Sequence, residues 1–392
     1  MEPEFPPPES EQPEDEPRRR GRARERQRRR RERQLQQAQP ASRNLRQVLP
    51  PGRLRFTLPE IRIPRLRLVA GLIAGVVIII GVVAFLRGLK PVEPEALPHA
   101  LWVGTEWTYA VHEPESIEAF AQHLRENRIG TVYAWVSWLQ EDATWRGAEN
   151  FGAVRAFAEQ IKEVYPELRL HGWLGFPTEL GSAGYRLDNE ELQQSIADFS
   201  ASIVNELGFD GVFLNVEPVW NGNEDFLALL RKVRSTVGDG VPLSVAIPPD
   251  WSPENAGIPV PPLIVPGTIW ETEYKQSVAL LSDEMAVMAY NSGLTAPEDY
   301  TQWLAYQVET YAKAVGELGQ GTEVLIGIPT YPEALPGHDP LVENVETALQ
   351  GFAAGLEQAG DAASFVRGLA IYAEWTTDDL EWAQFGEWVK RQ

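Results

Sequence analysis

The run FDGVFLNVE at residues 209–217 carries the side chain best placed for acid–base chemistry. In an extended strand, successive side chains point to opposite faces. Phe213, Asn215 and Glu217 therefore share one face, and the apolar set on the other face is Val212, Leu214 and Val216. A carboxyl group held in a cleft can donate or accept a substrate proton. The pattern predicts Glu217 as a general acid or base, the alternative being a salt-bridged rim residue.

Other polar and aromatic side chains lie near the ends of similar apolar runs. Aromatic rings present flat apolar faces that can stack on sugar rings. Some of these rings could instead belong to ordinary packing between elements. The candidates for substrate binding from these run ends are Glu106, Trp107, Trp135, Trp173, Asn291, Tyr331, Tyr372 and Trp375.

The segment DGVFLNVE at 210–217 resembles the DGxDxDxE strand-four motif of the family 18 glycoside hydrolases, the chitinase and chitinase-like group. Three later runs agree in order with that family. LSVAIPP resembles its fifth strand, VMAYN its sixth-strand M-x-Y-D/N, and IGIPTY its seventh-strand G-x-P-x-Y. The resemblance covers most of residues 100–380, although LHGWLGF lacks the Gly-Gly pattern of the third strand.

The resemblance implies a retaining hydrolysis of N-acetylhexosamine-containing glycans. Glu217 would protonate the glycosidic oxygen, and the substrate's own N-acetyl carbonyl would attack the anomeric carbon. Asn215 and Tyr290 occupy the places that orient the N-acetyl group. Tyr372 or Trp375 would form the aromatic floor, and Asp210, the first residue of the motif, joins the substrate-binding candidates.

Two positions depart from the family motif. Phe213 replaces its middle Asp, and Asn215 cannot supply the negative charge that stabilises an oxazolinium intermediate. Loss of that charge could lower the rate by ~10²–10³. A carbohydrate-binding, lectin-like protein on a catalytically weak or inactive fold is therefore the second hypothesis.

A different barrel-glycosidase clan offers a rival interpretation. In that clan an Asn directly precedes the strand-four acid, and a Glu nucleophile ends strand seven. Here Val216 separates Asn215 from Glu217, and IGIPTY ends without a carboxylate. A mechanism with two carboxylates would have to recruit a partner from elsewhere, the possibilities being Glu106, Glu333 and Glu374.

The sequence does not suggest a metal or a cofactor. Its five histidines lack metal-ligand spacing, it has no cysteine, and it contains neither a phosphate-binding glycine loop nor a Gly-x-Ser-x-Gly elbow. We therefore expect chemistry that needs neither a metal ion nor a cofactor.

Eight β-branched or aromatic runs, most of them separated by amphipathic stretches, must position these residues. Apolar residues recur at helical spacing in 114–127, 150–165 and 189–207. Alternating strands and helices in this number predict a (β/α)₈ TIM barrel over residues 99–392, with its active site at the carboxyl ends of the strands. The runs lie at 100–107, 130–138, 168–176, 209–217, 242–249, 285–291, 323–331 and 367–375.

Charge is distributed unevenly along the chain. Residues 1–67 hold 18 arginines against 10 acidic side chains, whereas residues 91–392 hold 15 basic against 46 acidic side chains. The second segment would repel nucleic acid, so we expect the barrel not to bind it. Because a barrel closes its own sheet edges, we also expect a monomeric soluble domain.

Residues 68–86, LVAGLIAGVVIIIGVVAFL, are uncharged for 19 residues, close to the ~20 that cross a bilayer. We expect a transmembrane helix there, a disordered cytoplasmic tail at 1–67 and a Pro-containing spacer at 87–98. More basic residues flank the amino-terminal side of the span, which predicts a single-pass protein of the cell membrane with an extracytoplasmic barrel. The Arg-rich tail is either solvated or a polybasic patch that binds anionic inner-leaflet lipid or nucleic acid.

Overall fold

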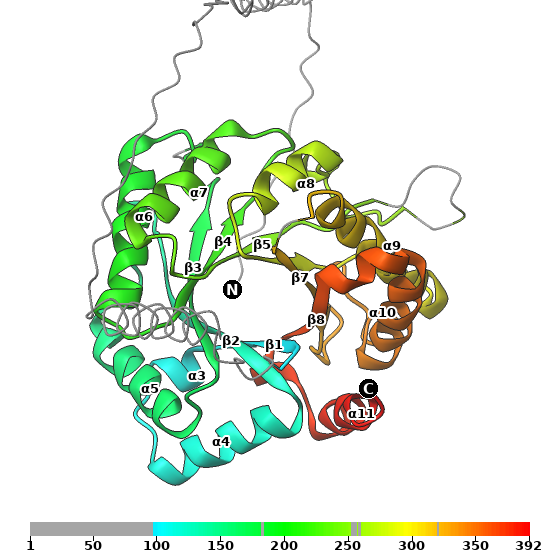
Figure 1. Ribbon diagram of the computed structural model, residues 1–392, viewed down its shortest axis with the longest axis horizontal. Helices are drawn as coiled ribbons and strands as arrows, with labels where there is room; N and C mark the ends of the chain where they lie inside the picture. The colour runs from blue at the N-terminus through cyan, green and yellow to red at the C-terminus, as the bar shows by residue number, and fades with distance from the viewer. Residues whose placement is uncertain (1–96, 182–183, 252–256, 258–259, 320) are drawn as a thin grey trace, which may run out of the picture. The chain divides into compact units, whose positions relative to one another are not determined.

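The computed structural model describes residues 97–392, apart from 182–183, 252–256, 258–259 and 320. Eight parallel strands follow one another around a closed barrel, and the last pairs with the first (Figure 1). The expected barrel is confirmed. The strands are β1 (His99–Val103), β2 (Ile129–Trp138), β3 (Arg169–Pro177), β4 (Gly211–Glu217), β5 (Leu243–Ile247), β6 (Glu284–Met288), β7 (Glu323–Pro329) and β8 (Val366–Tyr372).

Helices surround the barrel on its outside (Figure 1). The three stretches predicted to be helical are α4, α5 and α6, and the Asn189 side chain caps α6 by accepting hydrogen bonds from two backbone N–H groups. The helices are α3 (Thr105–Thr108), α4 (Pro114–Glu126), α5 (Phe151–Val164), α6 (Glu190–Asn205), α7 (Glu224–Val237), α8 (Thr272–Ala279), α9 (Pro297–Gly316), α10 (Val345–Ala359) and α11 (Asp379–Val389).

The inside of the barrel is filled by large aromatic rings that face small residues. Phe213 of β4 is fully buried and stacks on Tyr133 with ring centroids 4.0 Å apart, while Trp102 contacts both rings. Alanines on other strands leave room for these rings, namely Ala100, Ala246, Ala286 and Ala370. The opposite face of β4, Val212, Leu214 and Val216, packs in the layer under the helices, as the alternation predicts.

A charged cluster lies at the amino-terminal ends of the strands. Glu284 opens β6 and accepts hydrogen bonds from the hydroxyls of Tyr133 and Ser244, while Arg367 contacts its other oxygen at 2.8 Å. Arg169 and Arg367 share one oxygen of Glu323. Burial raises the pKa of Glu284 to about 7 and outweighs these partners, which favour the ionised form.

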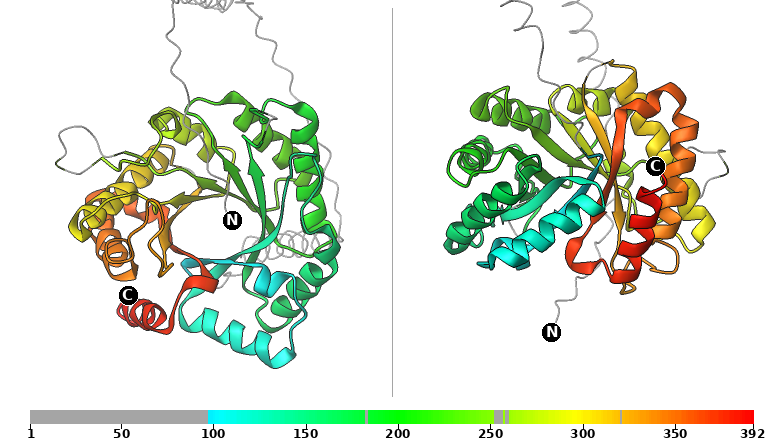
Figure 2. Two further views of the ribbon diagram at one scale, coloured as in Figure 1. Left: turned by 180° about the vertical axis from the view of Figure 1, so that it is seen from behind. Right: turned by 60° about the horizontal axis from the view of Figure 1, so that its bottom comes forward.

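The last helix closes the ring of helices against the first strand (Figure 2). His99 of β1 packs on Phe385 and Trp388 of α11, with ring centroids 5.1 and 5.6 Å apart. Trp382 of α11 meets His123 of α4 at 4.4 Å. The two ends of the barrel sequence therefore contact each other directly.

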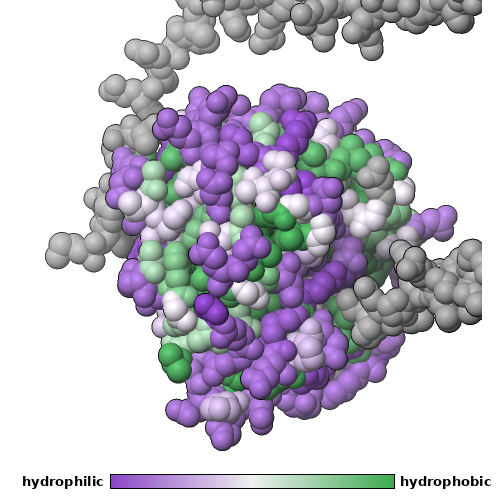
Figure 3. All heavy atoms as spheres, turned by 60° about the vertical axis from the view of Figure 1, so that its left-hand side comes forward, coloured by the Kyte–Doolittle hydropathy of each residue, from purple (hydrophilic) through white to green (hydrophobic). Residues whose placement is uncertain are grey.

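The predicted tail, the 68–86 span and residues 87–96 of the spacer lie outside the described residues. Within the described part of the chain, no helix is both long enough and apolar enough to cross a membrane. Hydrophilic residues prevail on the side of the barrel shown in Figure 3, with smaller apolar areas between them.

Candidate active site

Glu217 ends β4 and lies at the mouth of the barrel, next to a pocket of about 370 Å³. In the β3–β4 ladder, Glu217 pairs with Pro177 and Asn215 pairs with Gly175. A Cβ atom at Gly175 would lie only 3.0 Å from the Cβ of Trp138, so the glycine lets Trp138 pack closely against β3. The volume falls within the range of ~300–1,000 Å³ common for small-molecule sites. The pocket is lined by Trp135, Trp138, Gly175, Phe176, Pro177, Asn215 and Glu217.

The surroundings of Glu217 suit a proton donor. Its side chain is accessible to solvent, yet protein atoms surround it closely, as at the bottom of an open depression. This partial desolvation raises the pKa of the Glu217 carboxyl, and a hydrogen bond with the Asn215 side chain opposes the shift. A raised pKa keeps more of the carboxyl protonated near neutral pH, as a general acid requires.

Asn215 has an unused hydrogen-bond acceptor. Its Oδ1 atom is buried and has no partner among the described residues. Below it on the same face of β4 lies Phe213, which offers no hydrogen bond. A buried carbonyl oxygen without a partner is costly. A ligand N–H or O–H in the pocket could satisfy it.

Tyr290 and Tyr372 form a stacked pair above the barrel interior, with ring centroids 5.0 Å apart and planes 16° apart. Burial raises the pKa of both phenols, and the charge of Glu217 contributes to both shifts. Neither hydroxyl has a hydrogen-bond partner among the described residues, so both remain available to a ligand.

Three indole rings, those of Trp135, Trp173 and Trp375, extend the stacked tyrosine pair, and we call these five rings the aromatic wall. Trp135 meets Trp173 edge-on at 4.7 Å, and Trp173 lies parallel to Trp375 at 6.5 Å. Trp375 is 41% exposed, whereas Trp173 is buried and its Nε1 donor has no partner in the described part of the chain. These rings offer stacking faces and one free donor to a ligand.

Trp107 and Glu106 lie to one side of this wall. The ring of Trp107 stacks on Phe120 of α4 at 4.1 Å, and its Nε1 donates to Glu374 at 2.9 Å. The indole thus takes part in packing between helices. Glu106 is exposed, and its charge adds to the effect of burial, which raises the pKa of Glu374.

Asp210 lies at the other end of the barrel, which corrects its expected role in substrate binding. It precedes β4, forms a 2.8 Å ion pair with Lys162 and accepts a hydrogen bond from the backbone N–H of Leu170. The seven residues of β4 separate it from Glu217 by about 20 Å. Its role is to tie α5 and the start of β3 to β4.

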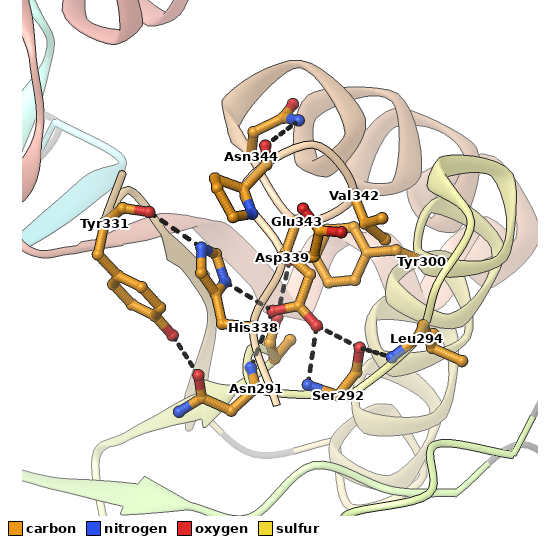
Figure 4. Close-up of polar contacts among 12 residues, drawn as sticks. Asn291, Ser292, Leu294, Tyr300, Tyr331, His338, Asp339, Val342, Glu343 and Asn344 are labelled. Atoms are coloured by element: carbon orange, nitrogen blue, oxygen red, sulfur yellow. Dashed lines mark hydrogen bonds and ion pairs between the residues drawn. The ribbon is translucent and has the colours of Figure 1, made fainter. Parts of the chain in front are cut away.

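Asn291 and Tyr331 meet at the rim next to Tyr290. The Tyr331 hydroxyl donates to Asn291 Oδ1 at 2.6 Å, and the Tyr331 ring lies 6.3 Å from that of Tyr372. Behind them lies a buried group that sequence reasoning missed, formed by Ser292, His338 and Glu343 (Figure 4). These residues follow strand ends, but no motif marks them.

The described residues contain no group of three or more His, Asp or Glu side chains that could hold a metal ion. The mouth offers the Glu217 carboxyl group with its raised pKa, an amide with a free acceptor, two free phenols and an aromatic wall, with the Glu374 carboxyl group at its edge.

No family model matches the chain, and no curated protein matches it in sequence. A chitinase from Bacteroides thetaiotaomicron has a similar structure, with 12% identity, a TM-score of 0.50, and coverage of 75% of this chain and 95% of that chain. At this identity the likeness shows the fold: the chain shares its barrel with a glycoside hydrolase.

Two further solved structures have slightly lower scores. A class V chitinase from Pseudomonas fluorescens Pf-5 has 14% identity and a TM-score of 0.49, over 74% of this chain and 99% of that chain. The spore cortex-lytic enzyme SleL of Bacillus cereus has 11% identity and a TM-score of 0.49, over 74% of each chain.

Proposed function

We propose that the protein is a glycoside hydrolase that cleaves N-acetylhexosamine-containing glycans, with Glu217 as general acid and base. The observation that carries this proposal is the placement of Glu217 beside Asn215 on a pocket at the barrel mouth, with the pKa of its carboxyl raised by burial. The aromatic wall next to it provides faces on which sugar rings can stack.

In the first step, Glu217 gives its proton to the glycosidic oxygen as the bond from that oxygen to the anomeric carbon breaks. The carbonyl oxygen of the substrate's N-acetyl group forms a bond to the same carbon, which yields a cyclic oxazolinium ion. Asn215 Oδ1 accepts a hydrogen bond from the acetamido N–H, and the Tyr290 hydroxyl donates to the acetamido oxygen. Both protein groups lack other partners in the described part of the chain.

In the second step, a water molecule attacks the anomeric carbon from the side that the leaving group vacated. The ionised Glu217 takes one proton from this water, and the bond to the acetamido oxygen breaks. Two inversions give net retention of configuration. The amide of Asn215 assists by hydrogen-bonding to Glu217 while that group is ionised.

A mechanism with a second carboxylate has less support. Two carboxyl groups ~5 Å apart, as in a double-displacement glycosidase, raise each other's pKa. Among the described residues that line the pocket, Glu217 is the only one with a carboxyl group. Glu106 acts instead on Glu374, at the edge of the mouth.

The decisive experiment is Glu217→Gln, which removes the transferable proton and nearly preserves shape. We expect turnover of N-acetylglucosaminide substrates to be abolished while oligosaccharide binding remains. Asn215→Asp is the companion variant, because restoring the carboxylate should raise the rate if the N-acetyl group assists. Wild-type turnover that survives Glu217→Gln would overturn the assignment.

A carbohydrate-binding protein without catalysis is the second candidate. The observation in its favour is that Phe213 and Asn215 leave Glu217 as the sole carboxyl group on this face of β4. If neither the wild type nor Asn215→Asp shows turnover on any glycan tested while oligosaccharides still bind, this candidate replaces the hydrolase.

We also propose that residues 68–86 anchor the chain in the cell membrane, with the Arg-rich tail in the cytoplasm and the barrel outside. The support is the 19-residue uncharged run and the excess of arginine before it. Protease added to intact cells should digest the barrel and spare the tail. A chain beginning near Pro98 should be soluble and monomeric in light scattering, and protection of the barrel from protease would refute the topology.

A further inference from the structure

Glu343 lies in the loop between β7 and α10 and is 1% exposed, although the chemistry above does not use it. One carboxylate oxygen accepts hydrogen bonds from the backbone N–H and the hydroxyl of Ser292, and the other accepts from the backbone N–H of Asn291 at 2.9 Å (Figure 4). The carboxylate thus fastens the β7–α10 loop to the turn that follows β6.

His338 joins the same group from the β7–α10 loop. Its Nδ1 atom lies 3.2 Å from the Glu343 carboxylate, and its Nε2 atom lies 2.9 Å from the carbonyl oxygen of Tyr331. Both ring nitrogens of His338 therefore lie against oxygen atoms, one of the Glu343 carboxylate and one of the Tyr331 carbonyl. On α11, burial raises the pKa of the Glu381 carboxyl group to about 7, and this group accepts a hydrogen bond from the backbone N–H of Asp378.

Asn291 and Tyr331 connect the contacts of Glu343 and His338 to the candidate active site. Asn291 adopts a left-handed backbone conformation with φ of 55°, which a residue other than glycine rarely takes without support. Its side chain accepts the hydrogen bond from Tyr331, and the imidazole of His338 packs on the Tyr331 ring at 4.0 Å. Tyr331 in turn meets Tyr372, the stacking partner of Tyr290.

We propose that Glu343 is a positioning residue for sugar binding, which holds Asn291 and Tyr331 at the pocket rim through the Ser292 turn and His338. The inference rests on the proposed function, because it assigns these two residues to the same sugar site. A buried carboxylate is weak support for stability, since well-packed apolar residues of similar volume often stabilise a fold equally well. The contacts of Glu343 instead fix one backbone conformation next to Tyr290.

The test compares Glu343→Gln with Glu284→Gln. Both change a buried carboxylate to its amide, but Glu284 lies at the opposite end of the strands. Binding of N-acetylglucosamine oligosaccharides is followed by tryptophan fluorescence at temperatures where both variants are folded. We expect Glu343→Gln to weaken binding about tenfold and Glu284→Gln to leave it unchanged. Equal binding by both variants would overturn the positioning role.

A double-mutant cycle distinguishes positioning from general loosening of the fold. Tyr331→Phe removes the hydrogen bond to Asn291, and if Glu343 acts through that pair, its effect should shrink at least threefold in the Tyr331→Phe background. The cycle of Tyr331→Phe with Glu284→Gln should be additive. Additivity in both cycles would show that Glu343 does not act through Tyr331.

Amide hydrogen exchange separates this inference from the proposed function. The backbone N–H groups of Asn291 and Ser292 bond to Glu343, so Glu343→Gln should accelerate their exchange about tenfold whether or not a sugar binds. If the wild type binds no glycan, the proposed function fails and the sugar role of Glu343 fails with it. If the wild type binds glycan but exchange at these amides is unchanged in Glu343→Gln, only the positioning inference fails.

Discussion

Asn215 hydrogen-bonds to Glu217 and keeps its own carbonyl oxygen buried without a partner. An amide can donate from its nitrogen and accept at its oxygen at the same time, which a carboxylate cannot do. Asn215 therefore stabilises the ionised form of Glu217, whereas an Asp would destabilise it. Burial raises the pKa of Glu217, and the residue at position 215 determines how far that shift is opposed.

Replacing Asn215 should consequently move the pH dependence of turnover. Because a general acid works in its protonated form, kcat/KM falls as pH rises through the pKa of Glu217. Asn215→Asp adds a negative charge and removes the donor, so we expect the alkaline limb to move to higher pH. Asn215→Leu, which removes only the hydrogen bond, should move it less. A limb that shifts to lower pH in Asn215→Asp would contradict this account.

Phe213 should resist conversion to the Asp of the family motif. The ring is fully buried against Tyr133 and Trp102, so Phe213→Asp creates a cavity and buries a carboxyl group among aromatic rings. We expect a loss of about 4 kcal/mol or more in the free energy of unfolding, measured with urea. The control Phe213→Leu should cost less than about 2 kcal/mol. A small effect of the Asp variant would mean that water reaches this position.

Trp375 should contribute to glycan affinity by stacking. Its ring is the exposed end of the aromatic wall. Removing one aromatic contact costs about 1 kcal/mol of binding free energy, which raises Kd roughly fivefold. Titration calorimetry of Trp375→Ala with an oligosaccharide measures this loss. Trp388→Ala, at the far end of α11, is the matched control and should bind like the wild type. Equal losses in the two variants would exclude a specific stacking role.

Glu284 should make the barrel less stable as pH rises. Its pKa is raised to about 7 in the folded protein, whereas the unfolded chain loses this proton near its ordinary value of 4.5. The stabilisation is therefore complete below about pH 4.5 and is lost as pH approaches 7. Thermal unfolding from pH 5 to 8 should show this decline in the wild type and a flatter profile in Glu284→Gln. Parallel profiles would rule out Glu284 as the cause.

The barrel could be predicted from sequence because its determinants are local. Each strand appears in the sequence as an apolar run of the length typical of a strand. In α6, the apolar residues Leu192, Ile196 and Ile203 recur at helical spacing. The alternation in β4 also places Phe213 inside and Val212 outside, as the structure confirms.

The less predictable features depend on partners distant in sequence. Asp210 matches the first residue of the family motif, but the match does not show at which end of the strand the residue lies. In the structure it lies at the amino-terminal end of β4 and pairs with Lys162. Glu343 bonds to backbone N–H groups 51 and 52 residues away, and a backbone donor leaves no side-chain signature to find. Trp107 follows a strand end in the sequence like the other indoles, and only the position of Phe120 in the structure shows that one face of its ring is covered.

The contact between β1 and α11 constrains how the domain folds during synthesis. β1 pairs with β8 as well as β2, and His99 rests on Phe385 and Trp388 of the final helix. β1 is the first strand of the domain to leave the ribosome, but its contacts with β8 and α11 can form only after nearly all of the remaining sequence has been synthesised. Until then its apolar surface and its free backbone edge stay exposed. We therefore expect closure of the barrel to be a late event, and a domain truncated before α11 to be prone to aggregation.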